Sequence, residues 1–453
     1  MKRNRRIAAA VVALLAAVLA AVLAGSGLAG PSRAHHAATL PPGNTVEQWN
    51  KIAEDTVVGS GAFQNESQIY MAYESTAVYD AVTAIQRGYS PIGPQVAAPS
   101  SASPDAAVVE AAYRALSHYF PTQSSTLGPL YDEALAAIPN GSSKSAGQAV
   151  GRDAARTVIN LRRDDGRMTP IGTTSSFPTL PPGPGVWRLT PAAYLAPQTP
   201  WVGQVRPFVL QSGDQFLPPP PPSLQSTEWV SGFNEIKAWG DALSHRRTAA
   251  ETATAKFFTA NAIRQYNGVA RSIVDARGLG LLETARLAAM VNVVGADAQI
   301  SVMNAKYHYL FWRPVTAIDP TSVTNDGFGQ VPGADDGNPA TVEQAGWRPL
   351  VNTPNHPEYP AAHGSLTGAM SVVFTSFLGT SDIDLDIHGF DPNGAPGNLD
   401  AVQHFATARD LRREIVNARV WAGLHYRFSG LAGVRLGRAV ARYDLAHAFQ
   451  PVG

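Results

Sequence analysis

An all-α fold is predicted by three features of this sequence. Apolar residues recur at helical spacing over most of the chain, helix start signals precede several of these segments, and the alternation that marks a strand is almost absent. The 453 residues can bury a large core, and a helical chain built from repeated bundles can form one unit of that size. We therefore predict a helical bundle, with residues 38–453 forming a single all-α domain.

Charge and cysteine content exclude several classes of protein. The chain carries 35 acidic and 35 basic residues, so its net charge gives no general attraction to nucleic acid or anionic membranes, and we expect no nucleic-acid partner. The sequence has no cysteine, which excludes disulfides, thiolate metal ligands and cysteine nucleophiles. Because the net charge is zero, a site that binds an anion must depend on basic residues gathered in one place.

Residues 1–34 have the layout of a secretory signal peptide. Four cations lie between Met1 and Arg6, an uncharged span runs from Ile7 to Ala24, and small residues follow. We expect cleavage between residues 25 and 38, a secreted, extracellular protein, and no stable membrane span after cleavage. An uncleaved anchor is the alternative, because the uncharged span approaches the roughly 20 residues that cross a bilayer.

Helices are expected from the start of the mature chain. Thr45 is a candidate N-cap for the first, and residues 68–86 carry a second apolar stripe. Ser103 followed by Pro104 is a strong start signal, because serine caps free N–H groups and proline suits the first helical position. Further helices fit residues 130–138 and 146–161.

Residues 166–226 interrupt the helices with a proline- and glycine-rich run. Proline on this scale is incompatible with a regular helix or a central strand. A linker between two domains is one interpretation, but Trp187, Trp201 and Phe208 are side chains that a disordered linker rarely carries. We favour an ordered loop that wraps across the helical body.

The most regular segment begins near Leu287. Its apolar face persists to Tyr309, which indicates a long central helix. The alternation in residues 382–387 favours a short strand or a solvated edge over a calcium loop, whose glycine and terminal glutamate are absent. Other helices are expected at residues 227–239, 248–265, 405–418 and 431–449.

Lys306 and Arg313 are the first residues of chemical interest. They lie seven residues apart and share one face if a helix continues through both. Pro314 makes Arg313 the expected helix end or the first loop residue, and either geometry can aim both cations at one point. In the ordinary alternative, Lys306 extends along an apolar surface to water and Arg313 caps the helix C-terminus.

His363 ends a proline-punctuated stretch, residues 356–363, that runs into apolar helical spacing from Leu366. A helix beginning near Gly364 would place this histidine among unpaired backbone N–H groups, where the helix dipole favours anions. His363 is therefore a candidate acid or base beside an oxyanion. A histidine that only caps or packs is the ordinary alternative.

Arg419 and His425 form a third group. Six residues separate them, so they lie on different faces of an unbroken helix and converge only if the helix ends or bends near Gly423. A surface ion pair and a core imidazole are the ordinary alternatives. Together the three groups supply three cations, two histidines and a helix N-terminus. Three converging cations would suit a tetrahedral oxyanion.

These motifs resemble those of the superfamily of vanadium-dependent haloperoxidases and acid phosphatases, including the type-2 phosphatidic acid phosphatases. The family pattern reads Lys-x6-Arg-Pro, then Pro-Ser-Gly-His, then Ser-Arg-x5-His-x3-Asp. The first block is complete in this chain. The second has Ala361 and Ala362 in place of serine and glycine. The third has Ala418 in place of serine and Ser429 in place of aspartate.

The resemblance implies a bacterial, secreted, haloperoxidase-like helical bundle that holds vanadate, with phosphate as a competing oxyanion. His425 would be the axial ligand of the metal, and His363 would act as acid or base on the apical oxygen. The resemblance also implies that the backbone N–H at Ala362 takes the place of the family's glycine. The residues that would bind the oxyanion are Lys306, Arg313, Ala362 and Arg419.

Two departures weaken the pattern. Ala361 lacks a hydroxyl that the family uses toward an equatorial oxygen, a hydrogen bond worth roughly 1.5–3 kcal/mol with a charged acceptor. Ser429 cannot supply the carboxylate that orients His425, although its hydroxyl can still accept a hydrogen bond from the ring. Both changes affect rate and anion affinity more than the location of the site.

Three functions remain open from the sequence. The first is a vanadate-dependent haloperoxidase-like oxidoreductase that oxidises halide with hydrogen peroxide, with or without an organic acceptor, in a pocket shaped by Phe311 and Trp312. The second is an acid phosphatase or phosphoesterase acting through a phosphohistidine at His425. The third is an oxyanion-binding protein with weakened catalysis.

A metal trio is a further alternative. His356, Glu358 and His363 offer ligands to a divalent cation. Two prolines constrain this loop, however, and the neighbouring cations would repel such an ion.

Overall fold

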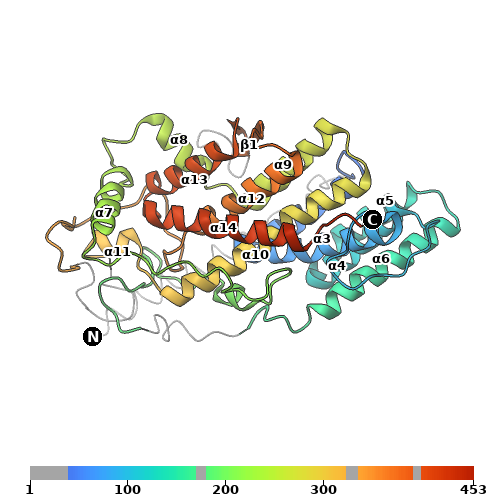
Figure 1. Ribbon diagram of the computed structural model, residues 1–453, viewed down its shortest axis with the longest axis horizontal. Coiled ribbons are helices and arrows are strands. Elements are labelled where there is room, and N and C mark those ends of the chain that lie inside the picture. The colour runs from blue at the N-terminus through green and yellow to red at the C-terminus, as the bar shows by residue number, and fades with distance from the viewer. Residues whose placement is uncertain (1–38, 170–179, 323–334, 391–398, 453) are drawn as a thin grey trace, which may run out of the picture. The chain divides into compact units, whose positions relative to one another are not determined.

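The computed structural model describes residues 39–169, 180–322, 335–390 and 399–452 (Figure 1). Helices dominate these residues, and the only regular strands among them form one two-stranded hairpin. The predicted all-α, helical-bundle fold class is therefore confirmed.

The predicted signal peptide lies outside the described residues and stays a prediction, as do its cleavage site and the domain boundaries. From Leu40 onward the chain forms one compact unit. Within the described ranges, no helix combines the length and the apolar character that a bilayer span requires.

Helix α10 (Leu281–Tyr309) runs through the middle of this unit and joins two groups of helices (Figure 1). On one side it packs against α3 (Gln64–Gln86), and on the other against α12 (Ala362–Leu378) and α14 (Arg427–His447). Almost every residue of α10 from Thr284 to Met303 is buried, as expected of a helix covered on all sides. The predicted long central helix is confirmed.

The first group is a bundle of α3, α4 (Pro104–Tyr119) and α6 (Ser142–Leu161), and the second is a bundle of α12, α13 (Ala408–Trp421) and α14. The remaining described elements cover these two bundles. They are α2 (Thr45–Gly59), η1 (Pro121–Gln123), α5 (Ser124–Ala136), η3 (Pro200–Gln204), α7 (Thr227–Trp239), α8 (Ala249–Phe257), α9 (Ala262–Arg277) and α11 (Pro314–Ile318).

At two early helices the N-cap predicted from the sequence lies within one residue of the observed N-cap. The Ser103 side chain accepts from the backbone N–H of Ala106 at the start of α4, as predicted. Helix α2 is capped by Asn44 rather than by Thr45. Asn44 is the N-cap because it forms a reciprocal capping box with Glu47.

A hairpin takes the place of part of a predicted helix. Strand β1 (Leu385–Gly389) pairs antiparallel with β2 (Ala401–Phe405), with Leu385 opposite Phe405. The alternation seen in the sequence therefore marks a strand. The predicted helix start at residue 405 is wrong, because Phe405 belongs to β2 and Thr407 caps α13.

The described part of the proline-rich run is an ordered loop, as predicted. Trp187 is fully buried, and its backbone N–H donates to the carbonyl of Leu310 at 2.6 Å. The Tyr359 hydroxyl donates to the carbonyl of Pro219 at 2.7 Å. The loop thus lies across the C-terminal end of α10 and the stretch that precedes α12.

Helices α12 and α14 approach each other until their backbones touch. A Cβ atom on Gly437 would lie 1.8 Å from the carbonyl oxygen of Ser365, and one on Gly433 would lie 2.3 Å from that of Ala361. Only glycine permits this separation. The contact fixes the position of the α12 N-terminus, where the candidate histidine lies.

Glu74 of α3 is buried at 3% exposure, and among the described residues its carboxyl has one hydrogen-bond partner, the Ser75 hydroxyl at 3.1 Å. Burial raises the pKa of this carboxyl from 4.5 to about 8. The folded protein therefore holds a proton that the unfolded chain releases between these two values.

We predict that Glu74→Gln flattens the dependence of stability on pH. Because the pKa of Glu74 is raised in the folded protein, its contribution to the free energy of unfolding is fully present below pH 4.5 and is lost as the pH rises to about 8. Within this window the free energy of unfolding falls by about 1.4 kcal/mol per pH unit. Urea unfolding across this window measures the effect. Parallel curves for wild type and Glu74→Gln would contradict the prediction.

Candidate active site

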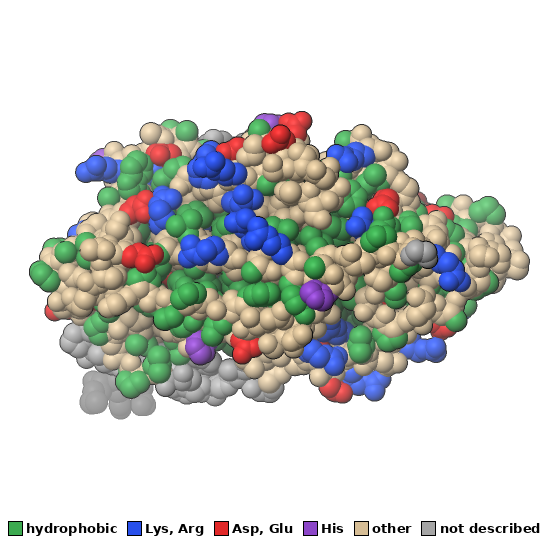
Figure 2. All heavy atoms as spheres, in the orientation of Figure 1, with side chains coloured by type: hydrophobic (Ala, Val, Ile, Leu, Met, Phe, Trp, Pro, Cys, Tyr) green, Lys and Arg blue, Asp and Glu red, His purple; other side chains and the backbone are tan. Residues whose placement is uncertain are grey.

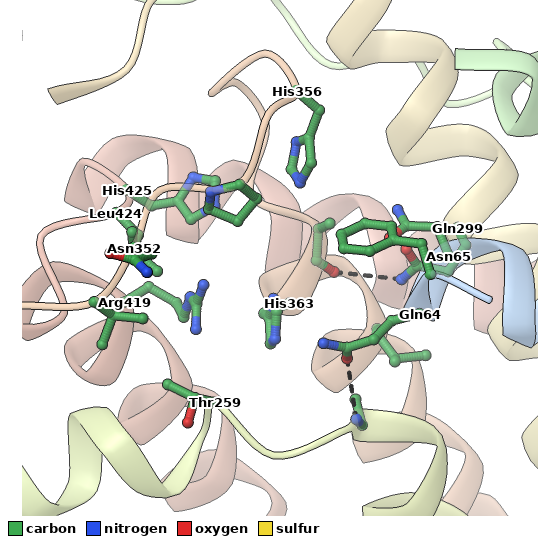
Figure 3. A pocket seen from close by; sticks show the side chains of 16 residues that line it. Gln64, Asn65, Thr259, Gln299, Asn352, His356, His363, Arg419, Leu424 and His425 are labelled. Carbon is green, nitrogen blue, oxygen red and sulfur yellow. Dashed lines mark hydrogen bonds between the residues drawn. The ribbon is translucent and has the colours of Figure 1, made fainter. Parts of the chain in front are cut away.

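A cavity of about 180 Å³ lies where several helix ends meet (Figure 3). It is bounded by the N-termini of α3 and α12, by the turn before α9, by the loop before α12 and by the turn between α13 and α14. The residues that line it are Phe63, Gln64, Asn65, Thr259, Ala262, Gln299, Val351, Asn352, Pro354, His356, Ala362, His363, Leu366, Arg419, Leu424 and His425.

His363 lies in the first turn of α12, close to the predicted start. Its N-cap residue, Ala361, makes no side-chain cap hydrogen bond, so no capping side chain covers the first N–H groups of the helix, and Ala362 lines the cavity. The ring Nε2 atom of His363 is buried and has no hydrogen-bond partner among the described residues. Burial, reinforced by Arg419 and Lys306, holds the pKa of His363 well below 6.5.

Arg419 and His425 converge because α13 ends between them. The helix stops at Trp421, and Gly423 follows with a φ of 77°, which turns the chain back. The guanidinium of Arg419 points toward His363 across the cavity (Figure 3). It donates to the carbonyl of Phe258 at 3.3 Å, and its Nε is buried without a partner in the described part of the chain.

Lys306 and Arg313 stand behind the cavity wall rather than on it. Helix α10 ends at Tyr309, and Arg313 becomes the N-cap of α11, so an unbroken helix through both cations is not formed. The Lys306 Nζ donates to the carbonyls of Pro357 and Glu358, both at 2.8 Å. These bonds tie α10 to the loop before α12.

Arg313 joins that loop to the turn that carries His425. Its Nε donates to the His356 carbonyl at 2.8 Å, and Nη1 donates to the Leu424 carbonyl at 3.0 Å. Nη1 also lies 3.2 Å from Nε2 of His425. The two cations thereby position a histidine that lines the cavity.

The basic side chains of the site are more numerous than its carboxylates. In contrast to the cations visible over α13 and α14 in Figure 2, Lys306 and Arg313 have no exposed area, and Arg419 is 3% exposed. Burial lowers the pKa of Arg313 to about 10 and, together with Arg313, that of Arg419 to about 9. Burial and Arg313 also hold the pKa of Lys306 well below 10.5. An anion in the cavity would relieve this excess of positive charge.

Glu358 is the buried carboxylate of the cluster. Its Oε1 accepts from Nδ1 of His425 at 2.9 Å and from the backbone N–H of Tyr426 at 3.1 Å. The expectation that the Ser429 hydroxyl accepts from the His425 ring is wrong, because that hydroxyl donates to the Glu358 carbonyl at 3.5 Å. The loop before α12 brings a carboxylate to the ring instead.

The metal trio of His356, Glu358 and His363 is not supported. Within the residues that the structure describes, no three or more histidine, aspartate or glutamate side chains are grouped so as to hold a metal ion. Glu358 is engaged by His425, and Nδ1 of His356 lies 3.0 Å from Nη2 of Arg313.

The expectation that Phe311 and Trp312 shape the pocket is also wrong. Both pack in an aromatic cluster with Trp229 and Tyr426, and the Trp229 and Trp312 rings stack at 5.8 Å. Neither residue lines the cavity. They support the site from behind.

The start of α3 forms a wall of the cavity that the sequence did not indicate. Gln64 accepts from the backbone N–H of Ala262 through Oε1 at 3.0 Å, which leaves its NH₂ group on the cavity side (Figure 3). Phe63 contacts the ring of His356 edge to face, with centroids 6.1 Å apart. More than two hundred residues separate this wall from the motifs, and no spacing pattern links them.

The arrangement of the helices is that of bacterial vanadium haloperoxidases. The chain resembles the first bacterial vanadium-dependent iodoperoxidase over 92% of its own length and 99% of that structure, with a TM-score of 0.72 and 22% identity. It resembles the holo-type bacterial vanadium-dependent chloroperoxidase over 90% of its length and 99% of that structure, with a TM-score of 0.65 and 17% identity.

A family model assigns the C-terminal part of the chain more directly. Residues 286–453 match the model described as the VCPO second helical-bundle domain. No curated protein sequence matches the chain. The predicted resemblance to the vanadium haloperoxidase superfamily is thus confirmed, while the roles of the individual site residues stay predictions.

We predict that His363 and His425 remain neutral as the pH falls to 6.5. Burial and the neighbouring cations hold the pKa of both rings well below that value. Two-dimensional ¹⁵N NMR of histidine-labelled protein, assigned with His363→Gln and His425→Gln, reads their protonation. A ring that takes up its proton at or above pH 6.5 would contradict the electrostatic description of the site.

Proposed function

We propose that this protein is a vanadate-dependent haloperoxidase-like enzyme that oxidises halide with hydrogen peroxide. The observation that carries the proposal is the buried group of Lys306, Arg313 and Arg419 beside a cavity lined by His363 and His425. Such an excess of basic groups is unfavourable unless an anion enters. The fold shared with iodoperoxidase and chloroperoxidase supports vanadate as that anion.

The donors around the cavity fit a tetrahedral oxyanion. Nε of Arg419 and Nε2 of His363 are buried without partners among the described residues, and buried polar atoms of this kind call for a ligand. Arg419 and the backbone N–H at Ala362, which line the cavity, would hold oxygens, and His425 would offer a ring nitrogen. Lys306 and Arg313, whose donors are bonded to main-chain carbonyls behind the wall, would contribute their positive charge. When bound, vanadate would supply Lewis-acid activation of the peroxide.

His363 is suited to move a proton in this cavity. Its ring is held neutral by burial and by the cations, so Nε2 is available to exchange a proton with entering hydrogen peroxide. Phe63, Leu366 and Leu424 place apolar side chains on the cavity wall, which we expect to limit the access of water. The halide or an organic acceptor would enter between these residues.

The same geometry also suits a phosphatase, which is the second candidate function. Nε2 of His425 faces Arg313, which can only donate, so this nitrogen carries a lone pair. A neutral imidazole with that lone pair can attack phosphorus and form a phosphohistidine, while His363 protonates the leaving alcohol. An oxyanion-binding protein without turnover would need only the basic cluster.

We further propose that the mature protein is secreted. The basis is the cationic start and uncharged span of residues 1–34.

We predict that orthovanadate added to phosphate-free protein switches on peroxide-dependent halide oxidation. Arg419→Ala should lower the vanadate affinity by about 10- to 100-fold, because charge-assisted hydrogen bonds are lost. Titration with halide oxidation and phosphate-ester hydrolysis followed in parallel measures both effects. Arg409→Ala, on the exposed side of α13, is the matched control and should leave the affinity unchanged.

The two activities separate the candidate functions. Vanadate that inhibits ester hydrolysis without starting halide oxidation would identify a phosphatase. Tight binding with neither activity would identify an oxyanion-binding protein. An unchanged vanadate affinity in Arg419→Ala would show that the basic cluster does not bind the oxyanion.

A further inference from the structure

Glu358 is held in a fixed position by its backbone as well as by its side chain. Its N–H donates to the Phe311 carbonyl at 2.8 Å, and its own carbonyl accepts from Lys306 Nζ at 2.8 Å. The side chain has no exposed area. A carboxylate restrained in this way can orient whatever group it contacts.

The contact that it makes determines the proton position on His425. Arg313 has no acceptor atom, so the 3.2 Å contact between Nη1 and Nε2 requires Nε2 to accept. The ring proton is then on Nδ1, where Glu358 Oε1 accepts it at 2.9 Å. Both partners therefore favour the same tautomer, with the Nε2 lone pair directed away from the carboxylate.

The sequence position that should supply this carboxylate does not. The family pattern places an aspartate four residues after the histidine, and this chain has Ser429 there. The Ser429 hydroxyl contacts the backbone carbonyl of Glu358 at 3.5 Å instead of the imidazole. Glu358 comes from the loop before α12, a different motif of the sequence.

We propose that Glu358 is the positioning residue for His425, replacing from the second motif the carboxylate that the third motif lacks. It acts through the ring: it holds the proton on Nδ1, so that Nε2 keeps the lone pair that now faces Arg313 and that it would offer to the oxyanion's central atom, and it raises the basicity of that nitrogen. The inference rests on the proposed function, because it assigns His425 as the residue that bonds to that atom.

A purely electrostatic role for Glu358 predicts the opposite sign. If Glu358 only offsets Lys306 and Arg313, its neutralisation in Glu358→Gln removes a repelling charge and strengthens the binding of every oxyanion. If it positions His425, the same variant weakens vanadate binding, which needs the ring nitrogen. Sulfate is the matched probe, because its central atom accepts no bond from an imidazole.

The experiment compares the affinities of vanadate-free wild type, Glu358→Gln and Glu358→Leu for orthovanadate and for sulfate by calorimetry. We expect the ratio of vanadate to sulfate affinity to fall by about 10- to 100-fold in both variants, and Arg409→Ala, on the exposed side of α13, to leave it unchanged. An unchanged ratio in the Glu358 variants overturns the inference, and so does a fall of this size in Arg409→Ala.

A second measurement needs no variant at Glu358. In wild-type protein, ¹⁵N NMR of the His425 ring, assigned by its loss in His425→Gln, should find the proton on Nδ1. A proton on Nε2 overturns the inference even if the Glu358 variants do not fold. If wild type binds no vanadate, the proposed function fails, and the tautomer alone then decides whether Glu358 positions the ring.

Discussion

The burial of three cations, Lys306, Arg313 and Arg419, with the carboxylate of Glu358 near the first two is the constraint on which the site depends. Removing cations from water costs several kcal/mol for each ion. Main-chain carbonyls of residues 356–358 and Leu424 offset part of that cost through hydrogen bonds to Lys306 and Arg313. The positive charge that remains lies beside the cavity, which is the basis for the proposed oxyanion site in a chain of zero net charge.

The ends of the helices determine where the residues of the site lie. Helix α10 stops before Arg313, α13 stops before Gly423, and α12 begins at Ala362, so each catalytic candidate lies at or next to an interruption of regular structure. The buried central helix and the glycine contacts between α12 and α14 hold these interruptions in register. The site residues thus lie on irregular backbone, and the rigid helical core holds that backbone in place.

Much of this arrangement can be predicted from the sequence because it depends on local signals. Helical spacing predicts the fold class, and Gly423 permits the turn that brings Arg419 toward His425. The contact between Glu358 and His425 cannot be predicted, because it depends on how two loops pack and because the family pattern points to residue 429. The cavity wall at Gln64 is also invisible in the sequence, since no periodicity connects it to residues so distant along the chain.

The most direct test of the account is a crystal structure of the protein soaked with orthovanadate. We predict an oxyanion in the cavity, contacted by Arg419, with a bond from its central atom to Nε2 of His425 and with Nδ1 still on Glu358. An empty cavity at saturating vanadate, or an oxyanion bound away from His425, would contradict it.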